Sequence, residues 1–282
     1  MHTSDQMDIL FFCPRWGSAS IPWREFAQKV KEAGYDGVET DIPFDLRERD
    51  ELMNALEEND LLLIAQHWET VEPVFESHLD EYTGRIAFLA SMRPLFINSQ
   101  TGKDYFSFRE NELLIRAAQA AYGALGVPVY HETHRGKFSF AAHITKDFLT
   151  RIPGLQLTLD ISHWCAVAES LLDDQPEAVQ AALQRTKHIH ARVGHTQGPQ
   201  VTDPRSDEWN DALQFHLDCW DKVVALNQQN GTPLLTFTTE FGPAPYMMHH
   251  PLTNEPIADQ WELNVFMKNM LKERYINNKV IA

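Results

Sequence analysis

The sequence has few cysteines and no long apolar run. Its 282 residues include three cysteines, Cys13, Cys165 and Cys219, which are far apart and odd in number. This pattern argues against a disulfide framework and favours reduced thiols in the cytosol. No run of about 18 apolar residues occurs, and the opening MHTSDQMD lacks the basic-then-apolar pattern of a signal peptide. We therefore expect a cytoplasmic protein that does not associate with a membrane.

Positive charge is also scarce. Lys and Arg number 24 against 40 Asp and Glu, which gives a formal net charge of −16. A nucleic-acid-binding protein needs a positive surface that displaces counterions from phosphates, so we expect no nucleic-acid partner. The chain also lacks Ser/Gly/Pro-rich stretches and long runs of one charge that would mark a linker. We therefore expect residues 1–282 to form a single domain.

Short apolar runs alternate with longer amphipathic segments along the chain. We expect strands at 9–13, 37–41, 61–67, 95–100, 127–133, 155–160, 188–193 and 234–240. We expect helices at 23–34, 47–59, 78–92, 109–125, 141–152, 176–186, 211–229 and 258–275. This count of strand–helix units is the one that a closed parallel barrel requires, whereas doubly wound sheets usually have about five or six strands. The sequence thus predicts an α/β protein with the (β/α)₈ TIM barrel fold, and an open α/β sheet is the alternative.

Metal-binding residue types occur at the ends of the last four expected strands. In barrels of this kind, functional groups lie where strands end and the following loops begin. The alternation of strand residues then indicates which side chains point to the barrel axis. One such side chain lies on each strand: Glu132, Asp160, His190 and Glu240. His188 and Arg192 are predicted to share the inner face, with His188 one layer deeper as a buried polar residue.

These four side chains suit one divalent ion. Two glutamates, one aspartate and one imidazole fit Mn²⁺, Mg²⁺ or Co²⁺, with Zn²⁺ as a further option. Three carboxylates that converge without a cation would repel one another, so a positive group is expected among them. For each residue taken singly, solvation or pairing with an arginine is the alternative.

Three histidines near the same mouth are candidates for other roles. His163 follows Asp160 by three residues, where the chain leaves the sixth strand. It suits a group behind the ligands, a substrate contact or a ligand to a second metal, and a loop histidine without a role is the alternative. His134, with Arg135, enters the loop after Glu132. His67 ends the third strand, and we weigh it, like His134, as a substrate contact.

The strand ends resemble the xylose isomerase-like barrel superfamily, and within it the sugar phosphate isomerase/epimerase group. The likeness runs from about residue 8 to residue 275 and rests on the order Glu, Asp-x-x-His, His-x-His and Glu over the last four strands. The matching segments are HETH (131–134), LTLDISHW (157–164), HIHARVG (188–194), TTEFGP (238–243) and WREFAQKVKEAGYDGVET (23–40).

The resemblance implies a role for each matching residue. It implies that the metal ligands are Glu132, Asp160, His190 and Glu240. It also implies that His163 contacts the substrate and that the two glutamates form the acid/base pair. The chain departs from the epimerases of the group at Thr196, where they have an arginine six residues after the metal histidine. Arg192 or Arg205 is a candidate substitute.

The same superfamily contains DNA repair enzymes that are similar to endonuclease IV and use three zinc ions. The resemblance does not extend to that site. The fourth expected strand ends in INSQ (97–100) without the required histidine, and the later Asp-x-His pair appears here as Asp203-Pro204-Arg205. Together with the net charge of −16, these departures exclude the nuclease interpretation.

We therefore expect a metal-dependent isomerase or epimerase of a small sugar or sugar phosphate. Glu132 and Glu240 are expected to transfer protons next to a carbonyl through a metal-stabilised enediolate. Trp16, together with Trp68 and Phe12, is a candidate to stack on the sugar, with packing as the alternative. A dehydratase of a keto-polyol such as an inosose and a non-catalytic sugar-binding barrel are the rival functions. The segment GPAPYMMHHP (242–251) is expected to form a pocket wall or a subunit contact, which leaves a homo-oligomer open.

Overall fold

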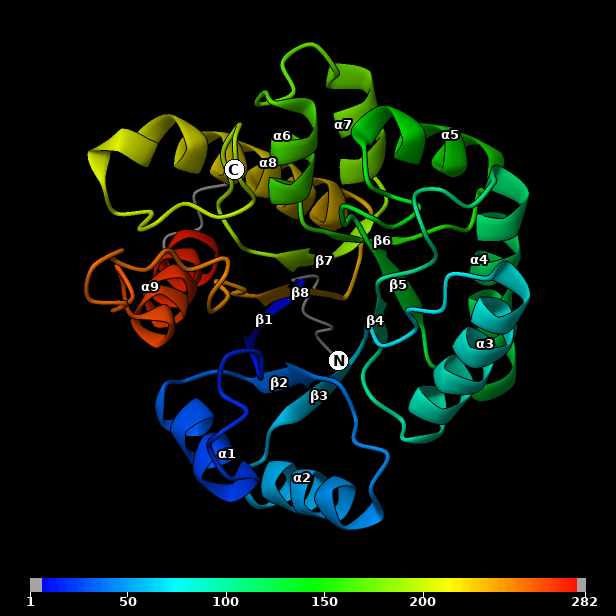
Figure 1. Ribbon diagram of the computed structural model, residues 1–282, viewed down its shortest axis with the longest axis horizontal. Helices are drawn as coiled ribbons and strands as arrows, with labels where there is room; N and C mark the ends of the chain where they lie inside the picture. The colour runs from blue at the N-terminus through cyan, green and yellow to red at the C-terminus, as the bar shows by residue number, and fades with distance from the viewer. Residues whose placement is uncertain (1–6, 278–282) are drawn as a thin grey trace, which may run out of the picture.

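The computed structural model describes residues 7–277, so the first six residues, on which the signal-peptide expectation partly rests, lie outside it. The described chain forms a closed barrel of parallel strands, in which each strand pairs with the next and β8 pairs with β1 (Figure 1). The strands are β1 (Asp8–Pro14), β2 (Gly37–Thr40), β3 (Leu62–His67), β4 (Ile97–Ser99), β5 (Val129–Glu132), β6 (Leu157–Leu159), β7 (Thr186–His190) and β8 (Leu234–Thr238). The barrel prediction is confirmed, and the open sheet is wrong because β8 closes onto β1.

Helices surround the barrel on its outer side (Figure 1). They are α1 (Trp23–Glu32), α2 (Leu46–Glu58), α3 (Phe75–Ser91), α4 (Phe108–Leu125), α5 (Ala142–Arg151), α6 (Ser162–Ala168), α7 (Pro176–Leu183), α8 (Asn210–Gln229) and α9 (Gln260–Lys272). A 3₁₀ turn covers Asp207–Trp209, and a π turn at Glu273–Asn277 continues α9. Of the helices in the described chain, none combines the length and hydropathy needed to span a bilayer.

The barrel has separate apolar contents inside and outside its wall. Phe12, Ile64 and Phe96 form a small buried cluster, and Tyr130 packs against it. The main core contains the opposite strand faces and the helices, with Phe11, Leu159, Ile189, Phe237, Trp220 and Leu263 among its members. Successive side chains of a strand point to opposite faces, so every second residue points into the barrel. Toward the C-terminal strand ends, these inward positions hold polar side chains. Phe12, a candidate for sugar stacking, is therefore an interior packing residue.

Two details of the sequence prediction are wrong near the site. The seventh strand ends at His190, although its alternation continues to Val193, because the Arg192 N–H turns back to donate to the His190 carbonyl at 3.0 Å. His163 lies in the first turn of α6, a short helix that was not expected. Its seven residues include Ser162, which donates hydrogen bonds to the Asp160 carboxylate, as described below.

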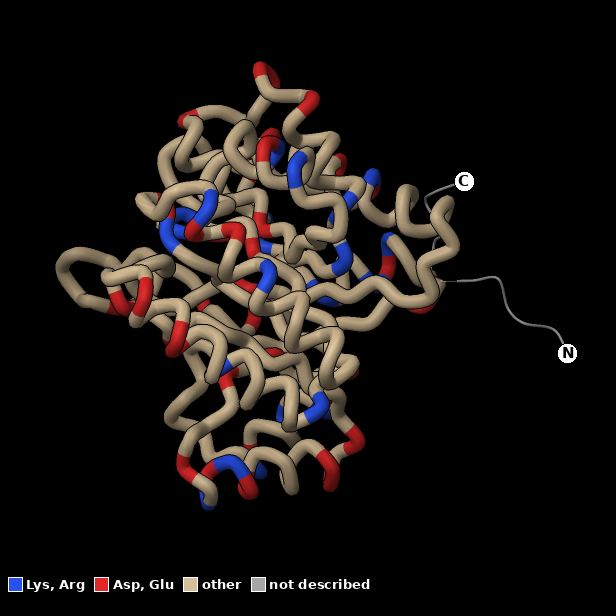
Figure 2. Tube along the Cα trace, turned by 90° about the vertical axis from the view of Figure 1, so that its right-hand side faces the viewer, with Lys and Arg blue, Asp and Glu red and all other residues tan. Residues whose placement is uncertain are grey.

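The charged residues and the cysteines lie as the composition leads one to expect. Basic and acidic positions are interspersed over the loops and helices (Figure 2). The three cysteines are buried and form no disulfide with one another. Gly37 lies where β2 packs closely against its neighbours, because a Cβ there would overlap the Leu62 carbonyl oxygen and the Phe12 ring.

Gly37→Ala is expected to lower the free energy of unfolding by roughly 1–3 kcal/mol, since the added carbon must displace backbone or a ring inside the barrel. Gly84→Ala is the matched control. Gly84 lies on α3, and nothing lies within 4 Å of its added Cβ, so this change should raise stability by roughly 0.5–1 kcal/mol. Urea unfolding of both variants measures the difference, and equal stabilities would contradict the packing argument.

Candidate metal centre and substrate pocket

The strand register brings the four predicted ligands to one end of the barrel. Glu132 is the last residue of β5, and His190 is the last residue of β7. Asp160 and Glu240 lie one and two residues past the ends of β6 and β8. The register pairs Glu132 with Thr158, and His190 with Thr238. Asp160 and Glu240 are therefore each two residues further along their strands, as the tilt of strands in a barrel requires.

The structure brings these four side chains together as a buried group. Each offers one ligand atom, and these atoms all lie within 4.8 Å of one another. Their exposed fractions are between 0% and 4%. Magnesium bonds of about 2.1 Å place opposite ligands about 4.2 Å apart. His190 Nδ1 has no hydrogen-bond partner, although it lies 2.9 Å from Glu240 Oε2. Such an unpartnered donor atom among carboxylate oxygens fits a divalent ion.

Glu39 is a buried partner of His190 that the sequence prediction missed. Its carboxylate lies 3.0 Å from His190 Nε2 and 3.2 Å from His188 Nε2. Asn98 Nδ2 donates to Glu39 Oε1 at 2.8 Å and to Glu132 Oε2 at 3.1 Å. Because Nε2 of His190 faces Glu39, its Nδ1 faces the cluster. A carboxylate behind a ligating histidine fixes its ring in many metal sites.

Glu39 also supports the deeper polar layer. Thr238 Oγ1 donates to its Oε2 at 2.5 Å, and His188 Nδ1 lies 2.7 Å from Thr236 Oγ1. His188 is 5.1 Å from Phe96, measured between ring centroids. These contacts agree with the interpretation of His188 as a buried polar residue. The GVET segment of β2 carried a signal for Glu39, since its alternation with Val38 directs the carboxylate inward.

Asp160 is held by its neighbours in sequence and in space. Ser162 donates from its backbone N–H to Asp160 Oδ1 at 3.1 Å, and its hydroxyl donates to the same oxygen. Thr133 Oγ1 accepts from the Asp160 backbone N–H at 2.8 Å. The first turn of α6 thus fixes the carboxylate as the chain leaves β6.

Arg192 supplies a buried positive charge to the cluster. Its Nη2 donates to Asp160 Oδ2, lies 3.6 Å from Glu240 Oε2 and lies 2.9 Å from His163 Nε2. Only 1% of Arg192 is exposed. The expectation that a positive group lies among the carboxylates is met in this structure by Arg192 and His190. Thr196 is half-buried, and Arg205 pairs with Asp203 at the surface.

The cluster also shifts the pKa values of its members. Burial raises the pKa of Glu132 to about 8, with His190 opposing the rise and the carboxylates of Glu240 and Asp160 adding to it. Burial opposes a charged His190, but Glu240, Glu39 and Glu132 outweigh it and hold the His190 pKa well above its usual value. Burial likewise opposes a charged Glu240, whose pKa is lowered by His190 and Arg192. Both shifts favour the protonated forms of Glu132 and His190.

A wall of aromatic rings stands beside the carboxylates. His163 and His134 are 3.9 Å apart between ring centroids, and His163 is 6.5 Å from Tyr246. Arg192 lies 4.8 Å from the Tyr246 ring centroid. His163 Nδ1 has no partner. With Glu132, the two histidines form a second group of metal-capable atoms, which agrees with the open interpretation of His163 as a group behind the ligands, a substrate contact or a further ligand.

Trp16 continues this wall from the β1–α1 loop. Its ring meets Tyr246 edge-on at 5.0 Å. Gln260 donates to the Trp16 carbonyl at 2.9 Å and to the Phe241 carbonyl at 2.8 Å, which ties this loop to the end of β8. Gly242 lies against the indole so closely that a Cβ would overlap it. Sequence reasoning placed Tyr246 only within the segment 242–251 and did not single it out.

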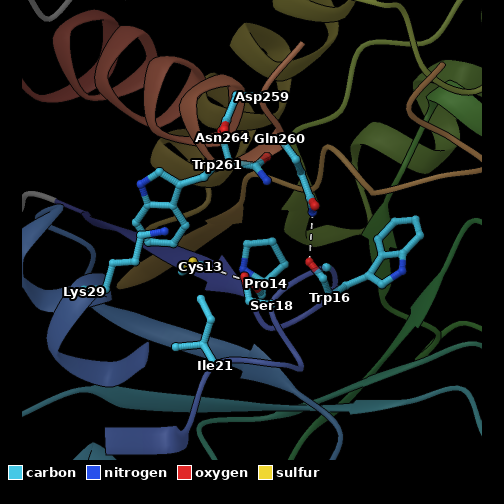
Figure 3. A pocket seen from close by; sticks show the side chains of 11 residues that line it. Cys13, Pro14, Trp16, Ser18, Ile21, Lys29, Asp259, Gln260, Trp261 and Asn264 are labelled. Atoms are coloured by element: carbon cyan, nitrogen blue, oxygen red, sulfur yellow. Dashed lines mark hydrogen bonds between the residues drawn. The ribbon is translucent and has the colours of Figure 1, made fainter. Parts of the chain in front are cut away.

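A small cavity of about 200 Å³ lies behind Trp16, between the β1–α1 loop and α9 (Figure 3). The Trp16 indole extends to the opposite side from Trp261 and Lys29 in that view. None of the four predicted ligands lines this cavity. It is thus separate from the metal-capable cluster.

His67 was predicted as a substrate contact. Its two ring nitrogens lie 3.1 Å from Ser99 Oγ and 2.9 Å from Thr70 Oγ1. Its ring packs edge-on against Tyr82 at 5.1 Å, and it is fully buried. Both nitrogens are engaged within the protein, so its contact with a substrate stays a prediction.

No protein-family model matches the chain, and no curated protein matches it either. Among solved structures, it is similar to a 3-keto-D-glucoside 4-epimerase from E. coli, with a TM-score of 0.63 and 14% identity over 95% of this chain and 100% of that chain. It is also similar to a sugar phosphate isomerase/epimerase from Parabacteroides distasonis, with a TM-score of 0.62 and 13% identity over 95% and 99% of the two chains.

An endonuclease IV from Thermus thermophilus shares the fold as well, with a TM-score of 0.56 and 13% identity over 94% of this chain and 99% of that chain. At these identities the similarity concerns the fold, and the residues of the site have to distinguish between functions. The chain therefore shares with these structures the closed (β/α)₈ barrel fold that its strand and helix pattern predicts.

Proposed function

We propose that the protein is a divalent-metal-dependent isomerase or epimerase of a small carbohydrate. One observation carries the proposal: Glu132 and Glu240 are both buried in the cluster that also contains Asp160 and His190. Two carboxylates beside one ion position suit proton removal and proton return next to a carbonyl. A site that only binds a sugar has no need of two such groups.

The ion would be held by Glu132, Asp160, His190 and Glu240. Carboxylate oxygens with one imidazole suit Mn²⁺, Mg²⁺ or Co²⁺. When bound, a divalent ion polarises a carbonyl and stabilises the negative charge that develops on its oxygen. Arg192 neutralises part of the carboxylate charge and adds a donor beside the same position.

The two glutamates are oriented by amide side chains. Gln66 Nε2 lies 3.3 Å from Glu240 Oε1, and Gln100 Nε2 lies 3.4 Å from Glu132 Oε1. In our proposal, one glutamate takes the proton next to the carbonyl and the other returns a proton. Return on the opposite face of the same carbon gives an epimer, and return at the neighbouring carbon gives an isomer.

In this proposal, the side of the substrate away from the carboxylates faces the aromatic wall, which consists of Trp16, Tyr246, His134 and His163. The flat faces of the Trp16 and Tyr246 rings suit the apolar face of a sugar ring. The unpartnered Nδ1 of His163 suits a hydroxyl group. These side chains would bind and orient the substrate and exclude water, while the glutamates move the proton.

Glu132→Gln and Glu240→Gln are each expected to slow turnover by about 10²–10⁴-fold, because each amide cannot accept the proton. Substrates come from a screen of ketoses, sugar phosphates and inososes with Mn²⁺. Reactions in deuterated water show the reaction type: deuterium in a recovered isomer supports our proposal, and net loss of water shows a dehydratase instead. Glu177→Gln, at an exposed ion pair with Lys146, is the control. Unchanged turnover in both active-site variants would refute the acid/base roles.

Glu39→Gln is expected to weaken metal binding by roughly 10–100-fold. The neutral amide is a weaker hydrogen-bond acceptor for the His190 ring than the carboxylate is, so it holds the ring less firmly. Titration of Mn²⁺ followed by electron paramagnetic resonance measures the affinity directly. Metal affinity equal to that of the wild type would show that Glu39 does not act on the site. A thermal unfolding curve for each variant separates this effect from loss of the fold.

Metal binding is expected to release protons, since the pKa values of His190 and Glu132 are raised and both side chains must be deprotonated to hold an ion. Their pKa values are raised, so the protons are present below those values and an ion must displace them. Affinity should therefore increase as the pH rises from about 6 toward 8. Calorimetric titrations of Mg²⁺ in buffers of different ionisation enthalpy count the protons, and a count of zero at pH 7 would contradict the prediction.

A further inference from the structure

Lys137 is a buried lysine that the proposed reaction does not use. It lies in the loop between β5 and α5, five residues after Glu132, and only 8% of it is exposed. Buried ammonium groups are normally paired, because the loss of hydration is otherwise not compensated. Within residues 7–277, no hydrogen-bond acceptor or ion-pair partner contacts its side chain. The Lys137 Nζ is not among the fully buried atoms that lack a partner, so it still reaches solvent. A negatively charged group from outside the chain can therefore contact this unpaired cation.

Lys103 stands beside it on the neighbouring loop between β4 and α4. Two backbone hydrogen bonds join the loops, from Asp104 N–H to the Gly136 carbonyl at 3.4 Å and from Phe138 N–H to the Thr101 carbonyl at 3.2 Å. Lys103 is half-buried and also has no ion-pair partner in the described chain. Asp104 is exposed and pairs with neither lysine.

The electrostatics of Lys137 agree with this arrangement. Burial and, to a lesser extent, the charge of Lys103 lower the pKa of Lys137 to about 8, and Glu132 opposes the fall. Lys137 is thus repelled by the charge of Lys103 and attracted by the carboxylate of Glu132, a member of the metal-capable cluster. Arg135 on the same loop lies 5.1 Å from the Tyr246 ring centroid and has no ion-pair partner among the described residues. We call Lys103, Arg135 and Lys137 the basic rim.

We propose that the substrate carries an anionic group, a phosphate or a carboxylate, which the basic rim binds through Lys137 and Lys103 while the reacting carbons lie at Glu132 and Glu240. This inference rests on the proposed function, because it assumes that the cluster is the reacting end. It narrows the substrate from any small carbohydrate to an anionic one. Charged hydrogen bonds from an ammonium group are among the strongest that a protein offers such a ligand.

The test measures anion binding without turnover. Ligand-observed NMR with the Mg²⁺-loaded protein, which contains no paramagnetic ion, follows inorganic phosphate and, separately, acetate. Lys137→Met is expected to weaken binding of the preferred anion by about tenfold or more, and Lys103→Met to weaken it less. Lys137→Arg should retain much of the binding, since it keeps the charge. Lys146→Met, at the exposed pair with Glu177, should leave binding unchanged.

The outcomes separate the two anions and the two proposals. Lysine-dependent binding of phosphate alone identifies a phosphate group, and lysine-dependent binding of acetate identifies a carboxylate. If neither anion binds, or if binding is equal in Lys137→Met, Lys103→Met and wild type, the inference is overturned. Should Lys137→Met fail to fold, the more exposed Lys103→Met still decides the result. If the anion binds but Glu132→Gln turns over substrate as fast as the wild type, only the proposed function is rejected. Turnover of neutral sugars without anion binding would reject only the role of the basic rim.

Discussion

Four buried carboxylates converge at the C-terminal end of the barrel, and their mutual repulsion is the constraint to which the rest of the site responds. Glu39, Glu132, Asp160 and Glu240 are each at most 4% exposed. Coulomb repulsion between like charges in a water-poor interior is strong. His190 lies between Glu39 and Glu240, and Arg192 contacts Asp160, so both cations reduce that repulsion.

The barrel keeps this arrangement rigid. Glu39 and Glu132 lie on strands, and Asp160 and Glu240 lie within two residues of strand ends. Amide side chains donate to three of these carboxylates: Asn98 to Glu39 and Glu132, Gln66 to Glu240, and Gln100 to Glu132. The apolar cluster of Phe12, Ile64 and Phe96 fills the interior beneath. Loops instead supply the aromatic wall and the basic rim. In barrels of this architecture catalytic residues come from the strand ends and the loops build the rest of the active site, which is the division of roles that our proposal assigns here.

Local patterns in the sequence predicted much of the fold and the centre of the site. Strand alternation alone places Asp160 and His190 on the inner face, since Leu159 and Ile189 must meet the helices. Their predicted convergence is seen in the structure, while their binding of an ion stays a prediction. The end of the seventh strand was predicted wrongly. The alternation of its residues continues through Val193, but the chain turns at Arg192, and no short-range pattern shows that turn. The short helix α6 escaped prediction because seven residues give too few turns for a periodic signal.

The sequence by itself determined which residue types lie at the strand ends and which face of each strand they occupy, because both follow from chain order and a period of two. Only the tertiary structure decided the pairings across the barrel. Glu39 meets His190 from β2, Arg192 reaches Asp160, and Tyr246 closes against Trp16. The lysines of the basic rim become neighbours through two adjacent loops. These contacts depend on strand register, barrel closure and loop packing, which join residues far apart in the chain and leave no local trace in its sequence.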